Sequence, residues 1–102
     1  MTWLFIGCID NDEILEVLSS IEEMSLYSRL KVDFNLWRHR PSNEIRPVIR
    51  IKCSAKDKYE IVEALGLKRI PNRGCMVYTR NEYIRKLYSE KGGVVGHAFE
   101  NL

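Results

Sequence analysis

Few residues in this chain have side chains suited to chemistry, and they form no complete catalytic set. Asp10 ends an apolar run, and with Asp12 it could hold Mg²⁺, which needs one or two carboxylates besides a substrate phosphate. An aspartate before an amphipathic helix is more often a helix cap, however. His39 and His97 lack a neighbouring Cys or Ser with an orienting carboxylate, so no nucleophile–base pair is indicated. We therefore expect a protein that is not an enzyme and uses no cofactor or metal.

The three cysteines follow no metal-binding or redox pattern. Cys8, Cys53 and Cys75 all lie in predicted strands, and their spacing matches neither a zinc site nor a CxxC pair. We expect them to be small buried hydrophobic side chains.

Length and composition are typical of a single globular domain covering residues 1–102. Charged residues make up 29% of the chain and hydrophobic residues 45%. The longest apolar run, residues 3–9, spans seven residues and is too short to cross a membrane, which takes about 20. No basic segment precedes the first predicted strand, so no signal peptide is expected. These features favour an intracellular protein without a membrane contact.

Charge is distributed unevenly along the chain. Residues 1–28 contain six acids and no Lys or Arg, whereas residues 29–102 contain all 16 basic residues against eight acids. A basic surface of this kind could bind nucleic acid, or it could bind the acidic helix of another copy of the chain. Self-association is therefore possible on charge alone.

Amino-acid usage favours a thermophilic source. Glutamine is absent, threonine occurs twice, and Ile, Glu, Lys, Arg and Tyr are frequent. In size and composition the chain resembles the small orphan proteins of filamentous viruses that infect hyperthermophilic archaea. That resemblance implies a role in the host cytoplasm or in the virion, and no known activity.

Hydrophobic periodicity predicts two strand–helix–strand units. The first unit, within residues 2–38, joins the apolar run, an amphipathic segment at 11–23 and an alternating strand at 30–37. The second, within residues 47–80, has strands at 48–53 and 74–79 around a helix at 54–65. Four apolar positions of each helix recur at an offset of 44 and form the predicted buried stripes, Leu15, Val17, Leu18 and Ile21 matching Tyr59, Ile61, Val62 and Leu65. A third helix and a tail are expected within residues 80–102.

Capping residues mark the start of each predicted helix. Asp10, Ser54 and Thr79 are each followed three residues later by an acid, the pattern of a helix N-terminus. Gly66 predicts the end of the second helix.

The predicted fold is α+β, with the order βαββαβ followed by a C-terminal helix. Duplicated strand–helix–strand units joined by a hairpin are typical of the ferredoxin-like fold, a four-stranded antiparallel sheet with strand order 4-1-3-2 and two helices on one face. In that order only Cys8 and Cys75 come close. The alternative is two βαβ-like modules with a groove between them, which periodicity cannot separate from the first arrangement.

Strand alternation predicts an aromatic face on the side of the sheet away from the two main helices. Large aromatics gathered on one face are typical of a binding surface. The alternative is that the third helix covers them through Tyr83, Ile84, Leu87 and Tyr88. The candidate partner-binding residues are Trp3, Phe5, Trp37 and Tyr78 with Met76 beside them and Arg50 and Lys52 at the margin.

We expect this face to form a groove between the two units that binds a protein or an extended peptide, which makes the chain an adaptor. Leu4-Phe5-Ile6-Gly7 resembles the first half of the strand-one motif of the RNA-recognition motif, which implies that Phe5 stacks on a base. Residues 47–53 lack the aromatics that this family carries on its third strand. Because this part of the resemblance is missing, single-stranded nucleic-acid binding on the sheet face is kept as the alternative function and not as the first.

Two further sites are weaker candidates. Asp10 resembles the metal-binding aspartate of CRISPR-associated small nucleases of ferredoxin-like fold, which makes a metal-dependent nuclease the third function. Arg38, Arg40 and Arg46 cluster in a charged loop that could dock an acidic partner or a phosphate.

Overall fold

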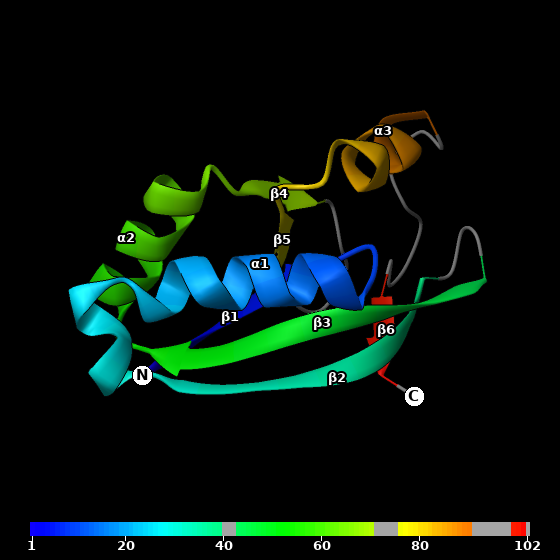
Figure 1. Ribbon diagram of the computed structural model, residues 1–102. Coiled ribbons are helices and arrows are strands. Elements are labelled where there is room, and N and C mark those ends of the chain that lie inside the picture. The colour runs from blue at the N-terminus through cyan, green and yellow to red at the C-terminus, as the bar shows by residue number, and fades with distance from the viewer. Residues whose placement is uncertain (40–42, 71–75, 91–98, 102) are drawn as a thin grey trace.

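The computed structural model describes residues 1–39, 43–70, 76–90 and 99–101, and Figure 1 traces the chain through them. The order is β1 (Thr2–Gly7), α1 (Asn11–Glu22), a 3₁₀ turn η1 (Ser25–Arg29), β2 (Lys31–His39), β3 (Glu44–Cys53), α2 (Ala55–Leu65), β4 (Lys68–Ile70), β5 (Val77–Thr79), α3 (Glu82–Glu90) and β6 (Phe99–Asn101). The α+β class is confirmed. None of the helices in these residues has the length and apolar character that a membrane crossing requires.

Within the described residues one mixed sheet contains six strands in the order β4-β5-β1-β3-β2-β6. Both β1 and β2 are antiparallel to β3, which lies between them, so β1–α1–β2 is a split strand–helix–strand unit as predicted. β6 pairs with β2 only along residues 37–39.

The predicted ferredoxin-like sheet is wrong on the side of β1 away from β3. The strand at 77–79 is the neighbour of β1, as predicted, but it runs parallel to β1 instead of antiparallel. The extra strand β4 is the reason, because the chain enters the sheet edge there and reverses into β5. With charged Lys68 and Arg69 in three residues, β4 carries almost no sequence signal for a strand.

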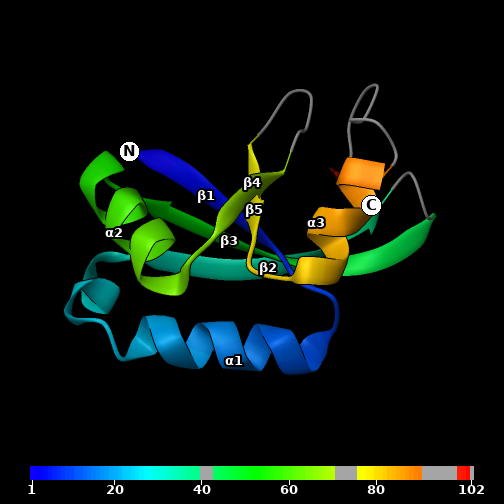
Figure 2. The same cartoon turned by 90° about the horizontal axis from the view of Figure 1, so that it is seen from above.

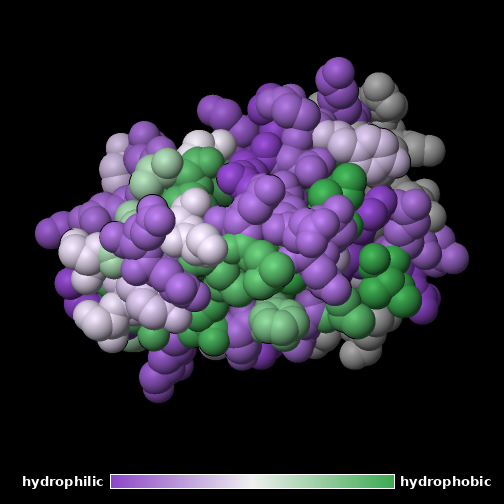
Figure 3. All heavy atoms as spheres, in the orientation of Figure 1, coloured by the Kyte–Doolittle hydropathy of each residue, from purple (hydrophilic) through white to green (hydrophobic). Residues whose placement is uncertain are grey.

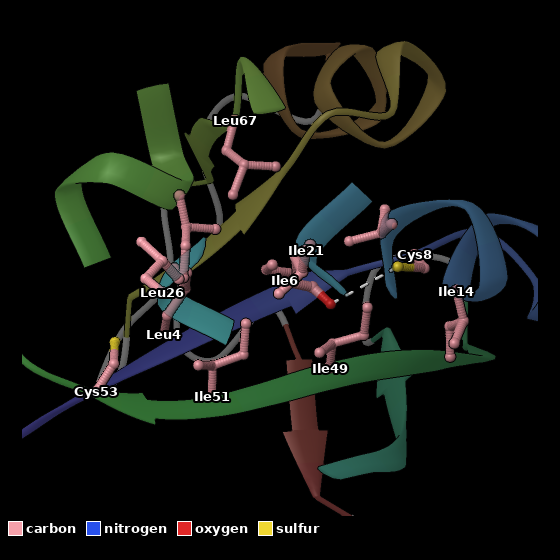
Figure 4. Packing of buried hydrophobic residues seen from close by; sticks show 12 residues of the cluster. Leu4, Ile6, Cys8, Ile14, Ile21, Leu26, Ile49, Ile51, Cys53 and Leu67 are labelled. Atoms are coloured by element: carbon pink, nitrogen blue, oxygen red, sulfur yellow. Dashed lines mark hydrogen bonds between the residues drawn. The ribbon is translucent and has the colours of Figure 1, made fainter. Parts of the chain in front are cut away.

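Two buried clusters lie on the two sides of the sheet. On the side that carries α1 and α2, here called the helical face, Leu4, Ile6, Ile49 and Ile51 point toward the helices, as Figure 4 shows. On the other side, here called the far face, the second cluster contains Trp37, Val48, Ile70, Val77 and Ile84, with Phe5 and Ile9 packed against it. Ile84 belongs to α3, so α3 covers part of the far face, and Figure 2 shows α1 and α3 on opposite sides of β2 and β3.

Helix starts follow the capping pattern, with one correction. The Asp10 carboxylate accepts the Glu13 amide at 2.9 Å, and the Ser54 hydroxyl accepts the Asp57 amide at 3.1 Å. Gly66 ends α2 in the left-handed conformation with φ 62°. The third cap is not Thr79, because the side-chain oxygen of Asn81 accepts the Ile84 amide at 3.0 Å.

The predicted buried stripes are wrong at the same position in both helices. Leu15 is 63% exposed and Tyr59 is 67% exposed, whereas Val17, Ile21 and Ile61 are fully buried. In α1 the inward position next to Leu15 is taken by Ile14.

Candidate binding surface

Five of the six predicted partner-binding residues lie on the far face, and Tyr78 does not. Trp3 is opposite Lys52 and Phe5 is opposite Arg50 in the β1–β3 ladder, so these four share a face. Tyr78 is aligned with Ile6 and packs against the buried cluster of the helical face. The prediction for Tyr78 is therefore wrong. Val77 is the residue of β5 that pairs with Phe5, so Val77 points to the far face and the adjacent Met76 and Tyr78 point to the helical face.

The aromatic residues of the far face form a row that is closed at one end and open at the other. The Trp3 and Phe5 rings stack with centroids 6.1 Å apart, and the Phe5 and Trp37 centroids are 5.4 Å apart. Trp37 is only 6% exposed, whereas Trp3 is 43% exposed. Trp37 is thus a core residue, and the expected groove is filled at that end by the cluster that includes Ile84 of α3.

Cations surround the open end of this row. The Arg50 guanidinium carbon lies 5.8 Å from the Trp3 ring centroid, and Lys52 Nζ lies 5.7 Å from it. Arg50 also donates to both carboxylate oxygens of Asp33, at 2.6 and 2.7 Å. These hydrogen bonds lower the pKa of the Asp33 carboxyl.

Lys31 and Lys52 lie directly opposite each other in the β2–β3 ladder. Directly opposed side chains in an antiparallel pair have Cβ atoms about 5 Å apart, and like charges there are destabilising. Within the described part of the chain, neither lysine forms an ion pair with an acid. Lys52 Nζ lies over the Trp3 ring, so Lys31 is the more available of the two positive charges on the far face. Lys31 belongs to β2, the outermost long strand.

A second candidate surface, which the sequence did not indicate, is an apolar groove on the helical face between α1 and β2. It is a hollow of about 230 Å³ lined by Asn11, Ile14, Leu15, Leu18 and Phe34. Phe34 is 58% exposed, and Leu36 and Ile45 beyond it are 52% and 53% exposed. In the space-filling view apolar side chains gather below α1, over β2 and β3 (Figure 3). We call this hollow the α1–β2 groove.

Phe34 and Leu36 are exposed because α1 does not reach over them. Alternation predicted correctly that they face the helices, together with Val32. A helix is about 10 Å wide and strands are about 4.8 Å apart, so one helix covers roughly two strands. α1 lies against β3 and leaves β2 at the rim. One indication of this exposure was present in the sequence. The predicted fold had two helices on a face formed by four strands, which is too few to cover all of them.

The outer edge of β2 is open next to this groove. Residues 31–39 pair with β3 on one side, and β6 occupies the other side only at residues 37–39. Among the described residues no strand pairs with the outer edge of residues 31–36, which we call the β2 edge. An unpaired edge of this kind exposes backbone N–H and C=O groups that can pair with another chain.

Asp10, one of the two residues proposed for metal chemistry, has a role in the fold. Asp10 caps α1, and the Glu13 carboxylate accepts the Ile9 amide at 2.8 Å. In the parts of the chain that the structure describes, no group of three or more His, Cys, Asp or Glu side chains is placed to hold a metal ion.

Other candidate side chains are either engaged or outside the described residues. Arg46 donates to the Ile9 carbonyl at 3.0 Å and pairs with Glu44. Arg40, Cys75 and His97 lie outside the described residues, and so do the side chains of His39, Leu87 and Tyr88, so the Cys8–Cys75 pair is not tested. The predicted arginine cluster is wrong for Arg38 and Arg46. They lie in β2 and β3 instead of a loop, and the pairing of Arg46 with Trp37 and of Arg38 with Ile45 puts them on opposite faces of the sheet.

Burial makes the thiols of Cys8 and Cys53 poorly reactive. Cys8 and Cys53 are free and fully buried. Burial raises the pKa of Cys8 to about 12 and also raises the pKa of Cys53. A thiol in this state is a poor nucleophile, because the thiolate is the reactive form.

Comparison with known proteins finds no matching protein family, no matching curated protein and no matching solved structure.

Proposed function

We propose that this chain is a non-enzymatic adaptor that binds an extended segment of another protein along the β2 edge. The observation that carries the proposal is the adjacency of two features. Residues 31–36 form a strand edge that no other described strand pairs with, and this edge lies beside the α1–β2 groove, where Leu15 and Phe34 are more than half exposed.

The two features suit one kind of ligand. A segment that adds to the sheet next to β2 gains main-chain hydrogen bonds, and every second side chain of that segment points to the helical face. Those side chains would enter the groove and contact Phe34 and Leu15. Affinity would come from the backbone and from burial of Phe34, while the groove would select apolar side chains.

This proposal keeps the class of function expected from the sequence and moves the site. The far-face groove required Trp37 as an anchor and Tyr78 on the same face. Trp37 is 6% exposed and Tyr78 belongs to the helical face, so neither is available on that surface.

The experiment uses a capped synthetic peptide of about seven residues that alternates valine and threonine, long enough to span the β2 edge. Titration calorimetry gives its affinity, and amide hydrogen exchange of residues 31–36 reports where it binds. Phe34→Asp should weaken binding roughly 30-fold, the effect of removing a central contact. Tyr59→Asp is the matched control, because Tyr59 is also more than half exposed, on α2.

Thermal melting of both variants separates binding from folding. Both should remain folded, because the two side chains are mostly in water. Equal affinity of wild type and Phe34→Asp, or no binding by the wild type at millimolar peptide, would overturn the proposal.

Single-stranded nucleic acid at Trp3 is the second candidate function. The exposed Trp3 ring between Arg50 and Lys52 is a stacking surface beside positive charge, the combination that such proteins use. Among the three described rings of this row, Trp3 is the open one, since Phe5 lies between Trp3 and the buried Trp37. An oligouridine titration tests it: affinity should fall steeply with salt and be lost in Trp3→Ala. Binding that is unchanged in Trp3→Ala would contradict this candidate.

A further inference from the structure

The partner of the β2 edge can be specified further by charge, on the basis of the proposed function. We propose that the bound segment carries an acidic side chain that pairs with Lys31 on the far face, while its alternate apolar side chains fill the α1–β2 groove. The site would then contact the side chains on both faces of the added strand.

Strand geometry places the acid. A strand that pairs with the β2 edge has side chains alternating between the two faces of the sheet. Its residue opposite Phe34 points into the groove, and its residue opposite Lys31 points to the far face. The side chain opposite Lys31 lies about 5 Å from it between Cβ atoms, within reach of an ion pair.

The charge already present at this position favours an acid over other side chains. Lys31 and Lys52 oppose each other without an ion pair to any acid in the described residues, whereas Arg50 is neutralised by Asp33 one step along the same ladder. An incoming carboxylate neutralises Lys31 and thereby relieves its repulsion with Lys52. An incoming lysine adds a third positive charge, so the site should reject it.

The acid belongs at one end of the segment only. Asp33 is the next far-face residue along β2, and a carboxylate opposite it would meet a like charge. The expected ligand is therefore apolar on the groove side, neutral opposite Asp33 and acidic at the Lys31 end.

Within the described residues, the opposite edge of the sheet is much shorter than the β2 edge. β4 is the opposite outermost strand and spans only Lys68–Ile70, too short for a ladder of this length. It does provide a matched control, because Lys68 is an exposed lysine on an edge strand far from β2.

The test varies one position of the valine–threonine peptide. Glutamate or lysine replaces threonine at the first outward position, and in a second pair of peptides at the last, because the direction of the bound strand is unknown. In one of the two placements, glutamate should raise the affinity roughly fivefold over threonine and lysine should lower it by a similar factor. The placement that responds also gives the direction of the bound strand.

A charge reversal on the protein should invert this preference. Lys31→Glu should bind the lysine peptide more tightly than the glutamate peptide, and Lys68→Glu should behave as the wild type. Lys31→Glu should melt no lower than the wild type, since it replaces a repulsion with Lys52 by an attraction. High salt should reduce the differences between peptides and leave the threonine peptide largely unaffected.

The outcomes separate this inference from the proposed function. If the threonine peptide binds and neither charge nor Lys31→Glu matters, the acidic partner is wrong and strand addition stands. If no peptide binds, both fail. If sedimentation shows a dimer that Phe34→Asp abolishes and that excludes the peptides, the occupant is a second copy of the chain and this inference is overturned.

Discussion

Glu13 and Asn81, 68 residues apart, are joined by a hydrogen bond from Asn81 Nδ2 to the Glu13 carboxylate at 3.3 Å. Glu13 belongs to the first turn of α1, and Asn81 caps α3. Glu13 Oε1 accepts the backbone amide of Ile9, and Arg80 Nε lies 3.8 Å from Glu13 Oε2. One buried carboxylate therefore holds the starts of two helices together, at the shared end of the parallel strands β1 and β5.

Glu13→Ala should lower the free energy of unfolding by about 2–3 kcal/mol, because it leaves the backbone amide of Ile9 and the side-chain amide of Asn81 without their acceptor. Urea unfolding at neutral pH measures the change. Glu22→Ala removes an exposed acid from the same helix and should stay within about 0.5 kcal/mol of the wild type. A loss for Glu13→Ala no larger than that of Glu22→Ala would contradict the role of Glu13 as a junction.

Trp37→Ala should destabilise the fold by about 3–5 kcal/mol, the cost of emptying a buried aromatic site. Trp3→Ala, one ring away along the same aromatic row, should cost about 1 kcal/mol because Trp3 is 43% exposed. Thermal and urea unfolding of the two variants provide the comparison. Similar losses for both would mean that Trp37 is not the core residue that its burial indicates.

Acid should weaken the fold through Asp57. Arg29 donates to both Asp57 carboxylate oxygens, at 3.0 and 3.2 Å, and these hydrogen bonds lower the pKa of Asp57. A lowered pKa in the folded state means that the stabilisation is present above the unfolded value, about 3.9, and is lost as the pH falls through the folded value. Asp57→Asn should therefore be less stable than the wild type at pH 7, with a gap that narrows below about pH 4.

Arg29→Met should reproduce that pattern, because Arg29 is the main cause of the lowered pKa. Urea unfolding at a series of pH values measures both variants. A gap between Asp57→Asn and the wild type that stays constant with pH would show that the ion pair contributes nothing.

The thiols of Cys8 and Cys53 should react only slowly in the folded protein at pH 8. Both are fully buried, and the pKa of Cys8 is about 12, so little thiolate forms. Cys75→Ser leaves these two as the only thiols for titration with a disulfide reagent. Both should react at once in urea and only slowly without it. Fast reaction of the folded variant would contradict their burial.

Features that depend on a few neighbouring residues were predictable from the sequence. The Asp10 and Ser54 caps, the left-handed Gly66 and the alternation along residues 30–37 all match the structure. A cap is a hydrogen bond between residues three apart, and strand alternation follows from the pleat. The placement of Trp37 on the face away from α1 and α2 followed from the same alternation.

Thr79 shows how a long-range contact overrides such a local pattern. Its hydroxyl donates to the Gly7 carbonyl at 2.8 Å and accepts the Asn81 amide at 3.0 Å, so Asn81 begins α3 instead. The carbonyl that accepts the Thr79 hydroxyl belongs to Gly7, 72 residues away in the chain. Nothing near Thr79 in the sequence indicates it.

By itself the sequence determined the positions of α1, α2 and the three long strands, and which face of each strand carries its apolar side chains. It did not determine the length of the β2–β3 hairpin, since β2 extends to His39 and β3 begins at Glu44 within the predicted charged loop. Only the tertiary structure decided that β5 runs parallel to β1, that Trp37 is covered, and that Phe34 and Leu36 remain exposed beside an open edge. Periodicity reports the direction in which a side chain points. Its exposure depends on what lies on that side, which is set by strand neighbours and by how far one helix can reach across a sheet.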